Sequence, residues 1–192
     1  MVAPTTAPPR RGVLDLTDFL DCAGITPEDG LGTGAFNIWS NTFPAAELPA
    51  RGSDVVVDGV PFRFPAEHPS GADNVRCARQ LVPVPRGRYD WIHVLAAAER
   101  RTEDEVLLHF ADGSVDAEWL RVSDFWPETP ARFGESAAFR CTRLHYPRHV
   151  QRNMGPVIWR RRVAVPREED LVALRLPDNP AVHVFALTLE AA

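Results

Sequence analysis

The fold prediction begins from one stretch of the sequence, Val157-Ile158-Trp159-Arg160-Arg161-Arg162-Val163-Ala164-Val165. Its odd-numbered positions are apolar apart from one arginine, whereas its even-numbered positions carry the other two arginines. An alternation with a period of two residues is typical of an antiparallel strand that has one face on a core and the other in water. The stretch therefore predicts a strand with a core side and a wet side.

The same alternation recurs on both sides of two Asp-Gly pairs. Asp58-Gly59 separates residues 55–57 from residues 60–64, and Asp112-Gly113 separates residues 105–111 from residues 114–122. Asp-Gly suits a two-residue hairpin turn, because both central residues of such a turn take positive φ angles. The sequence thus predicts two tight β-hairpins.

Strands are expected along most of the chain, and a short helix only around residues 15–23. Further strands are predicted over residues 75–82, 90–97, 137–145, 157–165, 171–176 and 181–189. Two antiparallel sheets can bury each other's apolar faces, so the expected fold is an all-β jelly-roll β-sandwich. We expect one such domain over residues 13–192, after a disordered tail at residues 1–12.

Composition excludes several classes of function. Among the 192 residues, 45% are hydrophobic and 24% charged, which is typical of a soluble globular protein. No lysine occurs, so all 21 basic residues are arginine, and the 26 acidic residues give a net charge of −5. Without lysine there is no Schiff-base catalysis, no lysine-anchored pyridoxal cofactor and no phosphate-binding loop lysine. The negative charge argues against a nucleic-acid partner.

The chain carries no signal for a membrane or for secretion. No apolar run reaches the length of about 18 residues that a membrane helix needs. The start, Met1 to Arg11, has no apolar region after its charges, so we do not expect a signal peptide. Three widely spaced cysteines, Cys22, Cys77 and Cys141, indicate buried reduced thiols. We therefore expect a cytoplasmic protein without a membrane partner.

Five segments follow one another in an order that is shared with a known family. They are Phe43–Pro49 (FPAAELP), Val57–Phe62 (VDGVPF), Asp73–Val75 (DNV), Gly87–Leu95 (GRYDWIHVL) and Leu176–Pro180 (LPDNP) with HVFAL at 183–187. Together they resemble the accessory β-sandwich domain of bacterial, especially actinobacterial, glycoside hydrolases. That domain is galactose-binding-like, of the carbohydrate-binding-module type. The resemblance implies a galactose-binding-like jelly roll, here as a stand-alone protein, that recognises a carbohydrate.

A sugar site needs an aromatic platform for the apolar face of the ring and planar polar groups for its hydroxyls. Trp39 lies between two asparagines, and the segment 144–149 holds a dense group of titratable and aromatic residues. The candidate ligand-binding residues are Asn37, Trp39, Asn41, His145, Arg148 and His149. Asp73 and Asn74 are an alternative second half of the cleft. In the other interpretation, Trp39 plugs the end of the sandwich, and Asn37, Asn41 and Asn74 cap the backbone of their own loops.

Acid–base and metal chemistry have weaker candidates. Asp124 and Glu128 could act with His145 or His149, provided that their loops meet. Pro147 between the two histidines argues against a helical metal clamp. Related jelly rolls often hold a structural calcium ion near the termini, which here would fall to Asp15, Asp18 and Glu190. No other cofactor is expected.

Three functions remain as hypotheses. The first is non-catalytic recognition of a carbohydrate or a sugar-like small molecule. The second is a small stand-alone enzyme of secondary metabolism, a cyclase or an isomerase. The third is a module that binds another protein through the Phe125-Trp126 loop. A shallow groove with exposed aromatic residues would favour carbohydrate recognition. A deep apolar cavity with one acid would favour the enzyme, and a flat apolar patch would favour the protein-binding module. The site requires that residues 36–43, 124–130 and 145–153 converge.

Overall fold

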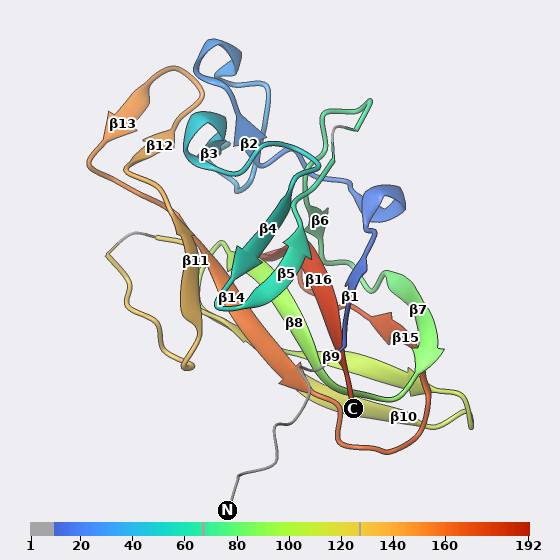
Figure 1. Cartoon of the computed structure of the whole chain (residues 1–192). Helices are drawn as coiled ribbons and strands as arrows, with labels where there is room; N and C mark the ends of the chain where they lie inside the picture. Colours follow the sequence, from blue (N-terminus) through green and yellow to red (C-terminus); the bar gives the residue numbers. More distant parts are fainter. Residues whose placement is uncertain (1–9, 67, 127) are drawn as a thin grey trace, which may run out of the picture.

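The computed structural model describes residues 10–66, 68–126 and 128–192 (Figure 1). Short 3-10 turns lie at Thr17–Phe19, Glu28–Gly30 and Ala45–Glu47. All the other regular elements of the described residues are strands. The strands are β1 (Arg11–Leu14), β2 (Ile25–Thr26), β3 (Phe43–Pro44), β4 (Asp54–Val57), β5 (Val60–Arg63), β6 (Val75–Arg76), β7 (Leu81–Gly87), β8 (Tyr89–Ala98), β9 (Thr102–Phe110), β10 (Val115–Val122), β11 (Ser136–Arg140), β12 (Arg143–His145), β13 (Val150–Arg152), β14 (Val157–Ala164), β15 (Leu171–Arg175) and β16 (Val182–Ala191).

Two antiparallel sheets face each other across the main core. The larger sheet has the order β1-β16-β8-β14-β11, with β6 also paired to β16, and the smaller sheet has the order β10-β9-β15-β7. Apolar side chains from both sheets, such as Val94, Leu108 and Trp159, are buried between them. The all-β sandwich expected from the sequence is therefore confirmed. In the described part of the chain, no helix is long and apolar enough to cross a membrane.

The larger sheet is covered on its second face as well. A second core of buried side chains, including Phe43, Phe62, Leu95 and Phe185, lies on the outer side of this sheet. The β4–β5 hairpin contacts β16 there, and β3 contacts β12. Because β8 and β16 are buried on both faces, they read as nearly continuous apolar runs rather than as alternating ones.

The solvent-exposed face predicted for residues 157–165, now β14, is only partly correct because of this second core. Ile158, on the even-numbered face of β14, is completely buried in the second core, whereas Arg162 on the same face is exposed. On the odd-numbered face, half-buried Arg161 donates to the carbonyl oxygen of Phe133. Only part of the even-numbered face is wet, because the chain before β8 folds back over the larger sheet.

One of the two predicted hairpin turns is confirmed. Asp58 and Gly59 both take positive φ angles, 49° and 75°, between β4 and β5. At the second turn only Gly113 does so, with φ of 88°. The Asp112 carboxylate instead accepts a hydrogen bond from the Ser114 amide at 2.9 Å, so β9 and β10 are joined by the longer loop 111–114.

Other element boundaries differ where the chain changes sheets. The strand predicted over residues 75–82 is divided, since β6 pairs within the larger sheet and β7 within the smaller one. The strand predicted over 137–145 is divided into β11 and β12 for the same reason. The helix predicted over 15–23 is wrong, because its only helical part is a 3-10 turn in which the Asp15 carboxylate accepts from the Thr17 amide.

The two ends of the described chain are paired. Strand β1 begins at Arg11, inside the range predicted as a tail, and it pairs with β16. Residues 1–9 of that range lie outside the described residues. All three cysteines are buried and free, in agreement with the predicted reduced thiols.

Candidate functional site

The predicted loops meet at one end of the sandwich. Strands β2, β3, β12 and β13 lie at the end of the molecule opposite to the C-terminus (Figure 1). A pocket of about 570 Å³, here called the end pocket, opens beside them. Its lining residues are Trp39, Asn41, Glu99, Arg100, Asp124, Phe125, Trp126 and Tyr146. Residues 36–43, 124–130 and 145–153 each contribute to this lining, so the convergence that the site requires is present.

Backbone hydrogen bonds hold these loops together. The Thr42 amide donates to the His145 carbonyl oxygen at 3.0 Å, and the His145 amide donates to the Thr42 carbonyl oxygen at 3.1 Å. The Phe125 amide donates to the carbonyl oxygen of Ala98, at the end of β8, at 2.9 Å. The loops are thereby anchored to each other and to the sheet, which fixes the walls of the pocket.

Aromatic side chains form much of the pocket wall. Trp39 is 60% exposed, Trp126 and Tyr146 are half-buried, and Phe125 is buried beneath them. The rings of Phe125 and Trp126 meet edge to face, with centroids 5.8 Å apart. Indole and phenol rings offer flat apolar faces together with a polar edge, which suits a ligand that has both apolar and hydroxyl-bearing sides.

Polar groups converge between these rings. Asn41, Glu99, Arg100 and Asp124 all line the pocket. Burial raises the pKa of Asp124, while the Trp126 amide that donates to its Oδ1 atom and the charge of Arg100 act in the opposite direction. Amide, carboxylate and guanidinium groups supply both donors and acceptors, so the pocket can satisfy several hydroxyl groups at once.

The local structure of residues 37–41 explains why Trp39 is exposed. The Asn37 Oδ1 atom accepts hydrogen bonds from the amides of Trp39 at 3.1 Å and Asn41 at 3.0 Å. Its Nδ2 atom donates to Asn41 Oδ1 at 3.1 Å, and Ser40 takes a positive φ of 54°. Asn37 is thus a capping residue of the loop, as the alternative interpretation predicted, but Trp39 does not plug the sandwich.

A buried polar chain runs behind the pocket. The Oε1 atom of Glu99 lies 3.8 Å from Nε2 of His183, whose Nδ1 atom lies 2.7 Å from Oδ1 of Asn74. Asn74 in turn donates to Asp73 at 2.8 Å. His183, Asn74 and Asp73 have no exposed surface at all. The chain therefore connects a carboxylate in the pocket wall to a fully buried imidazole.

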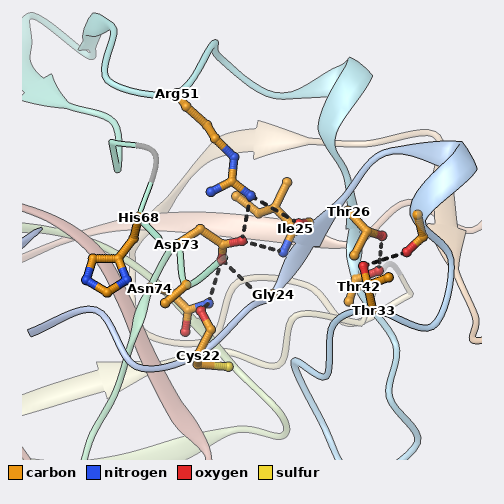
Figure 2. Close-up of polar contacts among 12 residues, drawn as sticks. Cys22, Gly24, Ile25, Thr26, Thr33, Thr42, Arg51, His68, Asp73 and Asn74 are labelled. Carbon is orange, nitrogen blue, oxygen red and sulfur yellow. Dashed lines mark hydrogen bonds and ion pairs between the residues drawn. The ribbon is translucent and has the colours of Figure 1, made fainter. Parts of the chain in front are cut away.

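Asp73 anchors the far end of this chain (Figure 2). Its carboxylate accepts hydrogen bonds from the amides of Gly24 at 2.8 Å and Ile25 at 3.0 Å, and Arg51 lies 3.2 Å away. Burial raises the pKa of Asp73, and these partners oppose that rise. Asp73 and Asn74 therefore do not line a cleft. They tie the loop before β2 to β16.

A family model described as the AziU2-like beta-sandwich domain matches residues 13–192. The chain belongs to this family. The match covers both sheets and all of the residues that line the end pocket. No curated protein matches the chain.

In this AziU2-like chain, the predicted ligand-binding residues separate into two groups. Trp39 and Asn41 line the end pocket, and Asn37 supports them. His149 stacks on the pocket residue Tyr146, with ring centroids 4.7 Å apart and an interplanar angle of 10°. These four predicted residues therefore lie in or next to the lining of the end pocket.

His145 and Arg148 are placed elsewhere. His145 is buried, and its Nδ1 atom lies 3.0 Å from Oγ1 of Thr26. Arg148 is exposed, and within the described residues neither it nor His145 belongs to the lining of the end pocket. Both were predicted as ligand contacts because they belong to the dense group of titratable and aromatic residues at 144–149, but only Tyr146 of this group lines the pocket. The candidate acid Glu128 is also exposed and outside the lining.

Sequence reasoning missed Glu99, Arg100 and His183. Glu99 and Arg100 belong to a run of mixed charge at 99–105, which is typical of a solvent-exposed loop. For His183 a signal was available: it is a titratable residue inside an otherwise apolar strand, and such residues are buried only with partners.

Two of the three residues suggested for a calcium site form other polar contacts. Glu190 accepts a hydrogen bond from Arg11 at 2.7 Å and lies 3.2 Å from Nε2 of His93. Asp15 accepts from Thr17 at 2.6 Å, and Asp18 is exposed. In the parts of the chain that are described, no group of three or more histidine, cysteine, aspartate or glutamate residues could hold a metal ion.

Proposed function

We propose that the end pocket binds a carbohydrate or a sugar-like small molecule. The observation that carries this proposal is the convergence of Trp39, Trp126 and Tyr146 with amide and carboxylate groups in one pocket. Its volume of about 570 Å³ lies within the range of about 300–1,000 Å³ that is usual for small-molecule sites. The resemblance to carbohydrate-binding accessory domains supports the same proposal.

The charges of the pocket narrow the ligand class. Two carboxylates, Glu99 and Asp124, line the pocket against a single guanidinium, Arg100. Acidic sugars would meet net repulsion, because like charges in a partly desolvated pocket repel each other. The pocket therefore favours neutral or amine-bearing sugar-like molecules, with the apolar ring face on an indole and the hydroxyls on the carboxylates.

The enzyme hypothesis is the second candidate, and one observation favours it. Glu99 is backed by the buried imidazole of His183, an arrangement that sugar binding alone does not need. The third hypothesis, a protein-binding patch at Phe125-Trp126, has less support, since Phe125 is only 1% exposed and does not form part of a flat surface.

Thermal unfolding against a panel of neutral, amino and acidic sugars tests the binding proposal. Each sugar is added with calcium and, separately, with chelator. A ligand at about 100 times its Kd stabilises the folded state by about 2.7 kcal/mol, and each kcal/mol raises Tm by about 2–4 °C for a chain of this size. We expect one class of neutral or amino sugar to raise Tm and Trp39→Ala to abolish the rise.

Trp119→Ala is the matched control. Trp119 is also exposed, at 49%, but it lies on β10 in the smaller sheet, outside the lining of the end pocket. The Tm rise should survive in this variant. A panel in which no sugar changes Tm, or a rise that both tryptophan variants lose equally, would contradict the proposal.

A further inference from the structure

We propose that Glu99 and His183 form a proton-exchanging pair that gives the end pocket acid–base chemistry, with Glu99 as the group that contacts the ligand. This inference rests on the ligand-binding role proposed for the end pocket. His183 does not touch the ligand in this scheme. It holds the exchanged proton behind Glu99.

The geometry brings the two groups face to face. Glu99 lies in the wall of the end pocket, with only 15% of its side chain exposed. Its Oε1 atom is 3.8 Å from Nε2 of His183, and Nε2 is buried without a hydrogen-bond partner. Phe36 covers the imidazole, with ring centroids 4.1 Å apart. A buried, unpartnered ring nitrogen is therefore aimed at a carboxylate of the pocket.

Asn74 determines which ring nitrogen carries the proton. Its Nδ2 atom donates to Asp73 Oδ1 at 2.8 Å and to the Cys22 carbonyl oxygen at 3.0 Å. Both partners are acceptors, so the amide cannot be flipped, and its Oδ1 atom faces Nδ1 of His183 at 2.7 Å. Nδ1 must donate to that oxygen. In the neutral imidazole, Nε2 therefore carries a lone pair directed at Glu99.

Charges around the pair leave this lone pair free to accept a proton. Burial lowers the pKa of His183; Arg76 lowers it as well, whereas Glu99 and Asp21 raise it. Burial raises the pKa of Glu99, but its interactions with His183 and Arg76 bring the pKa below its usual value. Arg100 and Asp124 are the charged groups that share the pocket with Glu99. Arg76 thus favours both the neutral imidazole of His183 and the carboxylate form of Glu99.

Such a pair can take one proton from a ligand and later return it. An O–H or N–H bond of the ligand breaks, the proton forms a bond with a carboxylate oxygen of Glu99, and the ligand heteroatom keeps the electron pair. The proton then moves to Nε2 of His183, which restores the carboxylate. Its return to a second atom of the same ligand completes an isomerisation, including addition of that heteroatom across a double bond within the ligand. No co-reactant is consumed.

The coupling of the two groups is measured by following the His183 ring in an NMR pH titration. In Glu99→Gln the neighbouring negative charge is lost, so the pKa of His183 should fall by about one unit or more. Glu128→Gln removes an exposed carboxylate outside the pocket and should leave the titration unchanged. An unaltered His183 titration in Glu99→Gln would overturn the pair.

The chemistry is tested with 5-nitrobenzisoxazole, whose ring opens when a base removes its C–H proton. The N–O bond breaks in the same step, and the coloured phenolate that forms reports the rate without any co-reactant. We expect the second-order rate constant of the wild type to exceed that of Glu99→Gln by about 10-fold or more. It should also decrease as Glu99 is protonated at low pH, and Glu128→Gln should behave as the wild type.

Equal rate constants for the wild type and Glu99→Gln would overturn the assigned base. This outcome is distinct from failure of the sugar proposal, which is measured by Tm shifts and by Trp39→Ala. If no sugar changes Tm but the His183 titration and the rate constant both depend on Glu99, the Glu99–His183 pair is supported. The ligand of the end pocket then belongs to another chemical class than sugars.

Discussion

Asp73 and Asn74 show how much a single residue can depend on tertiary contacts. In the sequence they are an ordinary polar pair before a strand, and such pairs usually cap their own loop. In the structure, Asp73 binds the amide of Ile25, 48 positions away, and Asn74 binds His183, 109 positions away. Their role could not be predicted, because both partners are distant in sequence.

Gly24 is fixed by the same contacts, and its substitution gives a prediction. A Cβ atom at this position would lie 2.7 Å from Nδ2 of Asn74 and 3.4 Å from Phe36. Asn74 is buried and has no room to move, so we expect Gly24→Ala to lower the free energy of unfolding by about 1–3 kcal/mol. Chemical denaturation measures this change.

Gly12→Ala is the control for that variant. No atom lies within 4 Å of the position of its Cβ atom, and Gly12 belongs to β1. Its effect should stay within about 0.5 kcal/mol. If both alanine variants were equally stable, the close packing of Gly24 against Asn74 would not restrict the residue at position 24.

Among the elements, the local sequence pattern was sufficient to predict the longer strands that stay in one sheet. Strands β8, β14, β15 and β16 lie where alternation or apolar runs predicted them. Two of the errors fall at crossings between sheets, at residues 75–82 and 137–145, where one predicted strand contains a change of partner sheet. The helix predicted near Asp15 is absent. The Asp15 carboxylate instead accepts a hydrogen bond from the Thr17 backbone amide, two residues on, and only a short 3-10 turn follows.

The β4–β5 turn provides a prediction at this scale. Gly59 has a φ of +75°, and a Cβ atom at this position would meet nothing within 4 Å, so any cost of substitution is conformational. We expect Gly59→Ala to destabilise the protein by about 1–2 kcal/mol. Gly59→Asn should cost less, because asparagine tolerates positive φ better than alanine does. Equal losses of Tm in the two variants would show that the turn is not under this constraint.

At the scale of the whole molecule, buried histidines make stability depend on pH. Burial lowers the pKa of His93, His145 and His183 below the unfolded value of about 6.5. The unfolded chain therefore binds more protons than the folded protein at mildly acidic pH, and stability falls as the pH drops below about 6.5. The raised pKa values of Asp73 and Asp124 act in the opposite direction, because the folded protein then holds more protons on these carboxyl groups than the unfolded chain does.

Urea unfolding at pH 7.5 and at pH 5.5 measures this effect. The midpoint should be lower at pH 5.5, and His145→Gln should reduce the difference between the two values. His149→Gln is the control, because His149 is exposed. A midpoint that is equal or higher at pH 5.5 would show that the buried histidines do not govern acid stability.

Local sequence pattern is enough to predict the fold class and part of the candidate site. Alternation and turn residues depend only on local order, so they predicted an all-β sandwich. The position of Trp39 between two asparagines suggested an aromatic platform, beside the alternative of a buried plug, and Trp39 is exposed. Tertiary structure alone decided which polar residues meet. Glu99 and His183 are 84 positions apart along the chain, and they approach each other only because β8 and β16 are neighbours in the larger sheet. Pairing between distant strands is set by the packing of the whole core, which no local pattern records.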